Sequence, residues 1–240
     1  MASVLIVPIA LGTCLATLIG GLFALAMRDR LHLVLGFSAG AVLGVAFFDL
    51  MPEALALGRN IDSRALLAIV ALGFFLYVLL DRSVAPHDHG RTLEKQQRRG
   101  WLGAGSLSVH SFLDGLAIGV AFQASRGVGI VVSVAVLIHD FSDGLNTVNV
   151  VVKNGGDRKN ALRWLLVDAV APVLGALASL TFSLPDGTIA VVLALFAGFF
   201  LYIGASDLLP ESHHAHPRLF TTLATLVGAA TLYGVTRIAG

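Results

Sequence analysis

Residues 188–209 read TIAVVLALFAGFFLYIGASDLL, and Asp207 is the only charged side chain in this run. A helix needs about 20 predominantly apolar residues to cross the hydrocarbon core of a bilayer. A membrane β-strand would instead show about ten residues of alternating polarity, which this stretch lacks. The run therefore predicts a transmembrane helix.

Comparable apolar runs fill most of the chain. Charged and turn residues separate them into seven further predicted spans, at roughly 4–27, 34–57, 65–82, 101–124, 127–152, 160–183 and 217–238. Hydrophobic residues make up 56% of the 240 residues and charged residues 13%, with a mean hydropathy of +0.84 and a formal net charge of +1. These values disfavour a soluble domain, a disordered chain and a nucleic-acid partner. We expect an all-α polytopic protein, with residues 1–240 forming one transmembrane domain in a lipid bilayer.

The first span bears on two questions: whether the chain can form a disulfide or a thiolate metal site, and whether its N-terminal segment is a signal peptide. Cys14 is the only cysteine, which excludes an internal disulfide and a metal site built from several thiolates. The span lacks a basic leading region, and its apolar stretch exceeds the usual 7–15 residues of a signal peptide. We therefore expect it to remain as a membrane helix.

Charge asymmetry predicts the orientation. With eight spans, 12 of the 16 lysines and arginines fall on one side of the membrane. The four on the other side are Arg59, Arg64, Arg126 and Arg237. Because basic loops stay in the cytoplasm, both termini are expected outside it, in the plasma (inner) membrane. The long polar stretch 83–100, with His87 and His89, falls on the cytoplasmic side.

The sequence contains two pairs of similar segments. Residues 49–53 (DLMPE) match residues 207–211 (DLLPE), with a glycine nine residues before the aspartate in both. Residues 110–116 (HSFLDGL) match residues 139–145 (HDFSDGL). Each pair joins an odd-numbered span with an even-numbered one, so its members run in opposite directions. Inverted repeats of this kind are typical of transporters, which bind their substrates near the bilayer midplane.

The second pair of segments carries the ligands for a metal site. His110 and Asp114 are four residues apart, as are His139 and Asp143. Four residues turn a helix by about 400°, so each histidine and its aspartate share a helix face. Two nitrogen and two oxygen ligands suit Zn²⁺ and related ions such as Fe²⁺, Co²⁺, Mn²⁺ or Cd²⁺, whereas Ca²⁺ and Mg²⁺ need only oxygen.

The energetic cost of the buried carboxyl groups supports this interpretation. An aspartate near the bilayer centre costs about 2.5–3.5 kcal/mol, so Asp114, Asp140, Asp143 and Asp168 would together cost about 10–14 kcal/mol. No lysine or arginine lies at a comparable depth. A bound dication, protonation or an aqueous cavity must compensate. The alternative is that these side chains are protonated or hydrogen-bonded contacts between helices.

Carboxyl groups also lie near both ends of the predicted path. Asp49 and Glu53 fall near the external end, and Asp207 and Glu211 near the cytoplasmic end, where they would attract and relay cations. We expect the prolines at positions 52 and 210 to end or kink their helices. A cytoplasmic metal relay is a further hypothesis; its candidate residues are His87, His89, His213, His214 and His216.

At these motifs the sequence resembles the ZIP (Zrt/Irt-like) family of divalent metal transporters. Residues 110–119 are similar to the signature of the fourth span of that family, and residues 196–211 to its seventh. The resemblance covers essentially the whole chain. It implies a 3+2+3 arrangement, with a central helix pair between inverted three-helix units, and a homodimer. It also implies movement of metal, usually zinc or iron, towards the cytoplasm.

The chain departs from the family pattern beside the predicted site. Many members carry asparagine where this chain has Ser111, and glutamate at the positions of Asp114, Asp140 and Asp143. Members with two adjacent metal sites have a glutamate before the proline of the sixth span; here Ala171 holds that position. The nearest acid is Asp168, which is a further candidate for the transport path. The resemblance therefore implies a first site of His110, Asp114, His139 and Asp143. Asp140 is a secondary ligand candidate.

The leading hypothesis is a divalent metal importer, with zinc as the foremost substrate, that works by alternating access. No cofactor is expected beyond the transported ion, and no enzymatic activity. A zinc-dependent intramembrane hydrolase is the alternative from a different class, since such enzymes also gather His and Asp in the membrane. A metal sensor that binds without transport is a third possibility.

Overall fold

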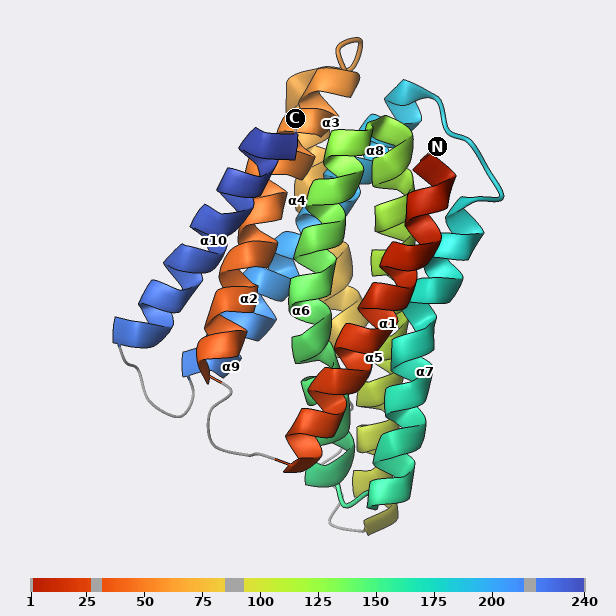
Figure 1. Ribbon diagram of the computed structural model, residues 1–240, viewed down its shortest axis with the longest axis vertical. Coiled ribbons are helices and arrows are strands. Elements are labelled where there is room, and N and C mark those ends of the chain that lie inside the picture. The colour runs from red at the N-terminus through yellow and green to blue at the C-terminus, as the bar shows by residue number, and fades with distance from the viewer. Residues whose placement is uncertain (1, 27–31, 85–92, 214–218, 240) are drawn as a thin grey trace.

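A computed structural model describes residues 2–26, 32–84, 93–213 and 219–239 of the chain (Figure 1). Within these ranges the regular elements are all helical, without a strand. The α-helices are α1 (Ala2–Ala26), α2 (His32–Val45), α3 (Met51–Leu57), α4 (Ser63–Val84), α5 (Leu93–Ala124), α6 (Arg126–Lys153), α7 (Arg158–Ser179), α8 (Asp186–Tyr202), α9 (Leu209–His213) and α10 (Leu219–Ala239). Two π-helical turns, η1 (Ala46–Leu50) and η2 (Ile203–Leu208), join α2 to α3 and α8 to α9.

Eight helical segments of the described chain are long and apolar enough to cross a membrane, which confirms the predicted fold class. The segment α2–η1–α3 forms one span, and α8 continues into η2 to form another. The N-terminal end of α1 and the C-terminal end of α10 lie at the same end of the molecule (Figure 1). In the membrane-spanning part of α6, 72% of the residues are buried, against 17% in α4 and in α10. Helix α6 therefore lies at the centre of the molecule.

The polar stretch 83–100 is shorter as a loop than we expected, because α5 begins at Leu93. Gln97 donates from Nε2 to the carbonyl oxygen of Gly155 at 3.0 Å, which ties the first turns of α5 to the segment after α6. The polar sequence thus forms a helical extension held by contacts from elsewhere in the chain. His87 and His89 lie outside the described residues.

The helices pack as two bundles. Bundle A contains α1, α5, α6 and α7, and bundle B contains α2, α4, α8 and α10. In Figure 1, α1, α5 and α7 lie on one side of α6, and α2 and α10 lie on the other. The two bundles meet where α6 contacts α2 and α10, and where α5 contacts α4 and α8.

Glycine pairs bring helices together inside each bundle. A Cβ atom added to any of these eight glycines would overlap a backbone carbonyl oxygen of the opposing helix, so no other residue fits without a shift of the backbone. The pairs are Gly20 and Gly144 between α1 and α6, Gly115 and Gly175 between α5 and α7, Gly40 and Gly228 between α2 and α10, and Gly73 and Gly198 between α4 and α8. None of these pairs joins bundle A to bundle B, so each bundle interlocks within itself.

The two proline-containing segments do not end their helices, contrary to one expectation from the sequence. Before Pro52, the N–H of Met51 donates to the carbonyl oxygen of Ala46, five residues earlier. Before Pro210, the N–H of Leu209 donates to Gly204 in the same way. Proline lacks an N–H and clashes with the preceding turn of an α-helix. A wider π-turn before the proline lets the helix continue into α3 and α9.

Candidate metal centre

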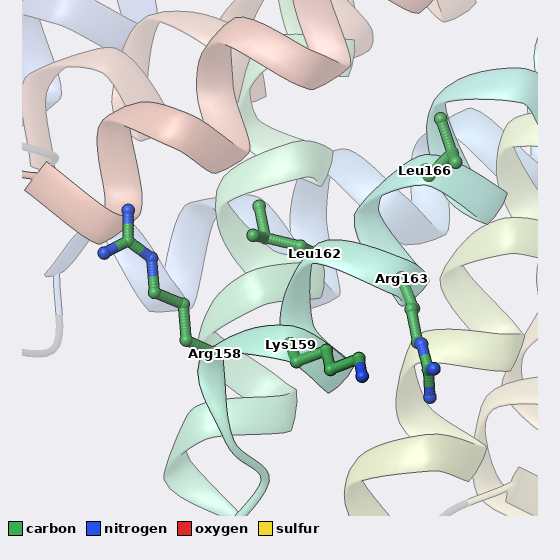
Figure 2. A pocket seen from close by; sticks show the side chains of 5 residues that line it. All are labelled: Arg158, Lys159, Leu162, Arg163 and Leu166. Carbon is green, nitrogen blue, oxygen red and sulfur yellow. The ribbon is translucent and has the colours of Figure 1, made fainter.

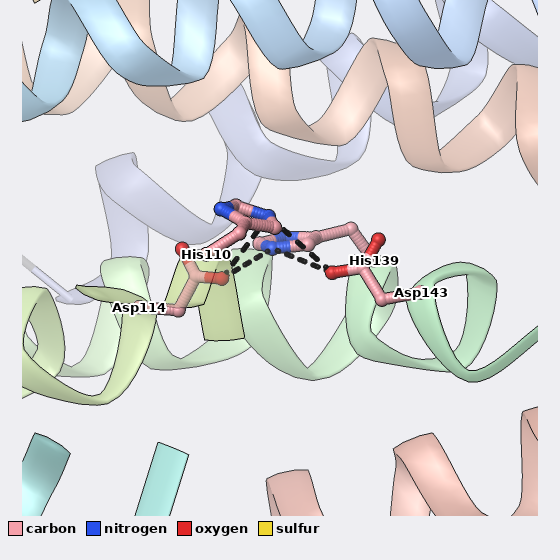
Figure 3. Close-up of side chains that lie close together, drawn as sticks. All are labelled: His110, Asp114, His139 and Asp143. Atoms are coloured by element: carbon pink, nitrogen blue, oxygen red, sulfur yellow. Dashed lines mark hydrogen bonds and ion pairs between the residues drawn. The ribbon is translucent and has the colours of Figure 1, made fainter. Parts of the chain in front are cut away.

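Helices α5 and α6 bring four potential metal ligands to one point. His110 and Asp114 come from α5, and His139 and Asp143 come from α6 (Figure 3). The spacing of four residues places both side chains of each pair on the face that meets the other helix, as expected from the sequence. One ligand atom from each residue lies within 4.8 Å of the others.

The four ligand atoms form a closed ring in which histidine and aspartate alternate. Nε2 of His110 lies 3.2 Å from Oδ2 of Asp114 and 3.4 Å from Oδ2 of Asp143. Nε2 of His139 lies 3.4 Å and 3.7 Å from the same two oxygens. Zn²⁺ binds N and O ligands at about 2.0–2.1 Å with tetrahedral geometry, which separates neighbouring ligand atoms by about 3.3 Å. The four distances between neighbouring atoms of the ring are therefore close to those of a zinc coordination sphere, and the remaining pairs lie within 4.8 Å.

Burial makes this arrangement costly without a cation. The exposed fractions are 4% for His110, 1% for Asp114, 0% for His139 and 2% for Asp143. Nε2 of His110 and Oδ2 of Asp143 are completely buried and have no hydrogen-bond partner. Buried polar atoms normally have a hydrogen-bond partner, so two atoms whose only polar neighbours are the other ring members fit a site that binds a cation.

The ring of His139 is oriented by its own helix. Its Nδ1 donates to the carbonyl oxygen of Ala135 at 3.0 Å, because a carbonyl can only accept. This bond leaves the lone pair of Nε2 free to face the centre, as in known metal sites where the second ring nitrogen is held by a hydrogen bond. Aromatic rings enclose the histidines: Tyr77 stands edge-on to His110, and Phe200 edge-on to His139. The hydrogen bond and the ring contacts orient both imidazole rings.

Asp140 lies beside the ring of ligands but outside it. Its Oδ1 is 4.0 Å from Nε2 of His139. The side chain is fully buried, and neither carboxyl oxygen has a hydrogen-bond partner. This placement is compatible with the secondary role predicted from the sequence, which stays a prediction.

Asp168 is not brought to the ring. Its two carboxyl oxygens accept hydrogen bonds at 2.7 Å from Ser111 Oγ and Thr147 Oγ1. The sequence analysis noted Ser111 only as a departure from a family pattern and missed Thr147. The available signal was spacing, since Thr147 stands one turn after Asp143 on the face that α6 turns towards α7.

The residues predicted at the two ends of the path belong to elements other than α5 and α6. Asp49 is on η1, only 6% exposed, and its Oδ2 has no hydrogen-bond partner. Glu53 is partly buried on α3. Asp207 lies on η2, and Glu211 and His213 on α9, but their side chains are not described. His214 and His216 lie outside the described residues.

An open cavity of about 530 Å³ lies on the first turns of α7, and none of the four ligands lines it (Figure 2). Arg158, Lys159 and Arg163 line it together with Leu162 and Leu166. Three cationic side chains would repel a divalent metal, so this cavity is not a second metal centre.

The fold and the site together define a class: an all-helical integral membrane protein whose central helices carry four ligands that fit a metal ion. A sequence profile described as "ZIP Zinc transporter" matches residues 83–236. The chain therefore belongs to the ZIP family, as the resemblance of its motifs implied.

Individual relatives agree with this assignment. The chain is 28% identical to the zinc transporter ZupT of Corynebacterium aurimucosum over 240 residues, which cover 91% of each chain. It is 27% identical to zinc transporter ZIP13 of Pongo abelii over 220 residues, which cover 86% of this chain and 64% of that longer protein. It is 35% identical to human zinc transporter ZIP10 over 115 residues, 48% of this chain and 14% of that protein. All three are named as transporters and none as an enzyme, which favours transport over hydrolysis.

Proposed function

We propose that this chain imports a divalent transition-metal ion into the cytoplasm through the site formed by His110, Asp114, His139 and Asp143. Zinc is the foremost substrate, and iron, manganese, cobalt and cadmium are the other candidates. The observation that carries the proposal is the closed ring of four buried ligand atoms, with neighbours 3.2–3.7 Å apart. The names of the relatives support zinc, since ZupT and ZIP13 are both described as zinc transporters.

An inverted 3+2+3 arrangement in a single domain of residues 1–240 is part of the proposal. Its support is the pattern of helix contacts. If α1 corresponds to α7, α2 to α8, α4 to α10 and α5 to α6, the contact of α1 with α6 corresponds to that of α7 with α5. The contact of α2 with α10 likewise corresponds to that of α8 with α4. Reciprocal glycine pairs lie at all four contacts, which supports the same correspondence.

Alternating access would arise from movement of bundle A against bundle B. All four ligands belong to bundle A, so a bound ion would stay with that bundle. The interlocking glycine pairs support each bundle as a rigid unit. Contacts between the bundles involve side chains, including a hydrogen bond of 3.0 Å from Ser142 Oγ on α6 to Ser38 Oγ on α2. Rigid-body motion of one unit against another is the common mechanism of transporters with inverted repeats.

The path and the surroundings complete the proposal. Metal would pass from Asp49 and Glu53 on the external side to the four-ligand site, and then towards Asp207 and Glu211. Asp140 would assist as a secondary ligand. Both termini would face away from the cytoplasm in the plasma membrane, which the excess of basic residues on the other side supports. The chain would act as a homodimer. A cytoplasmic metal relay would be formed by His87, His89, His213, His214 and His216.

The direct test is metal uptake by proteoliposomes, measured by elemental mass spectrometry for Zn²⁺, Fe²⁺, Mn²⁺, Co²⁺ and Cd²⁺. Wild-type protein is compared with Asp114→Ala and Asp143→Ala at matched protein density. Saturable uptake that both substitutions abolish is the expected result, and the relative rates rank the substrates. Binding of metal without uptake would instead make the chain a sensor.

A further inference from the structure

The carboxyl group of Asp168, on α7, is held by hydroxyl groups from the two helices that carry the metal ligands. Ser111 on α5 donates to Oδ1 and Thr147 on α6 donates to Oδ2, both at 2.7 Å. All three residues have an exposed fraction of 0%. Ser111 Oγ also lies 3.1 Å from the carbonyl oxygen of Leu107, but a hydroxyl has one hydrogen and the carboxyl contact is shorter. Both carboxyl oxygens are therefore satisfied.

These two hydroxyl groups stand next to the ligands in sequence. Ser111 directly follows His110, and Thr147 lies one helical turn beyond Asp143. The carboxyl group thus bridges α5 and α6 close to the level at which their ligands meet. The bridge is therefore placed where it can influence the distance between the two helices, and with it the size of the ligand ring.

The same bridge leaves few ligands for a second ion. Zinc sites in proteins use three or four protein ligands. Outside the ring, Asp140 is the one carboxyl group near the centre, among the described residues, whose two oxygens both lack a hydrogen bond. Ala171, before the proline of α7, has no ligand atom. The oxygens of Asp168 are already used by hydroxyl donors.

We propose that Asp168 is a positioning residue: its hydrogen bonds to Ser111 and Thr147 set the spacing of α5 and α6 in place of a second metal ion, and the chain binds one divalent ion at its centre. This inference rests on the proposed function, because it concerns the same metal site. It assigns Asp168 to the support of the ligands and removes it from the transport path.

The test measures zinc bound to the purified full chain in nanodiscs. Elemental mass spectrometry gives the number of ions per chain, and competition with a chelating dye gives the affinity. One ion per chain is expected. Thr147→Val keeps the side-chain shape but removes the donor, and should weaken zinc binding about tenfold, the low end for residues that support metal ligands. Thr147→Ser restores a hydroxyl and should restore the affinity.

A matched control separates positioning from general packing. Ser133 is also a buried serine, on α6, but its hydroxyl donates to the carbonyl oxygen of Gly129 in its own helix and not to Asp168. Ser111→Ala should therefore weaken zinc binding, whereas Ser133→Ala should leave it unchanged. X-ray absorption of the bound zinc should show altered ligand distances in Thr147→Val, a change that a loss of stability alone would not cause.

The outcomes distinguish the two proposals. A wild-type chain that binds two ions, or one whose zinc affinity and spectrum are unchanged by Thr147→Val, overturns the role given to Asp168 and leaves the proposed function standing. A wild-type chain that binds no zinc or other divalent ion overturns the proposed function and this inference with it.

Discussion

The two helix crossings that flank the metal centre have the same backbone geometry but different polar chemistry. At the α5–α7 crossing, Gly115 and Gly175 each face a carbonyl oxygen of the opposing helix. At the α1–α6 crossing, Gly144 and Gly20 do the same. The register also agrees: Ser111 and Asp140 each stand four residues before their glycine, and Asp168 and Thr13 each stand seven residues before theirs.

The two crossings differ in which helix carries the carboxyl group. At one crossing, Asp168 on α7 receives the hydroxyl of Ser111 on α5. At the other, the hydroxyl belongs to Thr13 on α1 and the carboxyl to Asp140 on α6, and the two are not paired. Thr13 instead donates to the carbonyl oxygen of Ala10 in its own helix, at 2.9 Å. The comparison teaches that the backbone geometry is symmetric while the polar chemistry is not: one carboxyl group is held by two hydrogen bonds, and the other has none beside His139.

The largest effect is expected from removing the centre that both crossings support. Asp143→Ala should lower metal uptake by more than about 100-fold, because it removes a direct ligand where even supporting residues contribute 10–100-fold. Uptake by proteoliposomes checks this. Asp186→Ala is the control, since Asp186 is an exposed aspartate at the start of α8. Normal uptake by correctly inserted Asp143→Ala would refute the assignment of the site.

The shared frame can be tested by filling either crossing. Gly115→Ala and Gly144→Ala should each destabilise the protein by about 1–3 kcal/mol, since the added methyl group meets a backbone carbonyl and the helices must separate. Thermal unfolding in detergent should show similar losses for both. Gly234→Ala is the matched control, because nothing lies within 4 Å of its added methyl group. A loss at only one crossing would argue against the equivalence.

Because the two crossings differ in their hydrogen bonds, the same change from aspartate to asparagine should affect stability differently at positions 168 and 140. Asp168→Asn should destabilise the protein by about 1–3 kcal/mol, because two hydrogen bonds to a buried carboxyl group are weakened. Asp140→Asn should not reduce stability, since its carboxyl oxygens have no hydrogen bond to lose. Thermal unfolding of metal-free protein measures both. If Asp140→Asn were the more destabilising variant, the division between a structural and an unpaired carboxyl group would be wrong.

The smallest effect is expected between the bundles. Ser38→Ala removes the hydrogen bond from Ser142, and with it the bond of 3.2 Å from Ser38 Oγ to the carbonyl oxygen of Ile138. Hydrogen bonds between membrane helices contribute about 0.6 kcal/mol on average. A double-mutant cycle with Ser142→Ala should give a coupling of that order. A coupling several times larger would show that the bundles are fastened at this point.

The sequence predicts much of this arrangement because its signals are local. Apolar runs predict eight spans, and a four-residue spacing predicts that His110 and Asp114 share a face. The similarity of residues 110–116 to residues 139–145 also predicts that the ligands of α5 and α6 belong to one site. The pairing of Asp168 with Ser111 and Thr147 could not be predicted, since it depends on how three helices cross. The π-turns were also missed, because a proline disturbs the preceding turn in several ways and only packing selects one of them.

The π-turn at residues 46–50 has a consequence for how related sequences align. Such a turn contains about one residue more than an α-helical turn over the same rise. A relative that lacks one residue here would close the turn to regular α-helix and keep both flanking halves of the span intact. The residue would be lost without a break in the helix, and the residues on either side would keep their positions around the helix axis, whereas one residue lost from a regular α-helix rotates everything beyond it by about 100°. A one-residue gap placed in this segment is therefore structurally reasonable, whereas the same gap in the middle of α6 would separate His139 from Asp143.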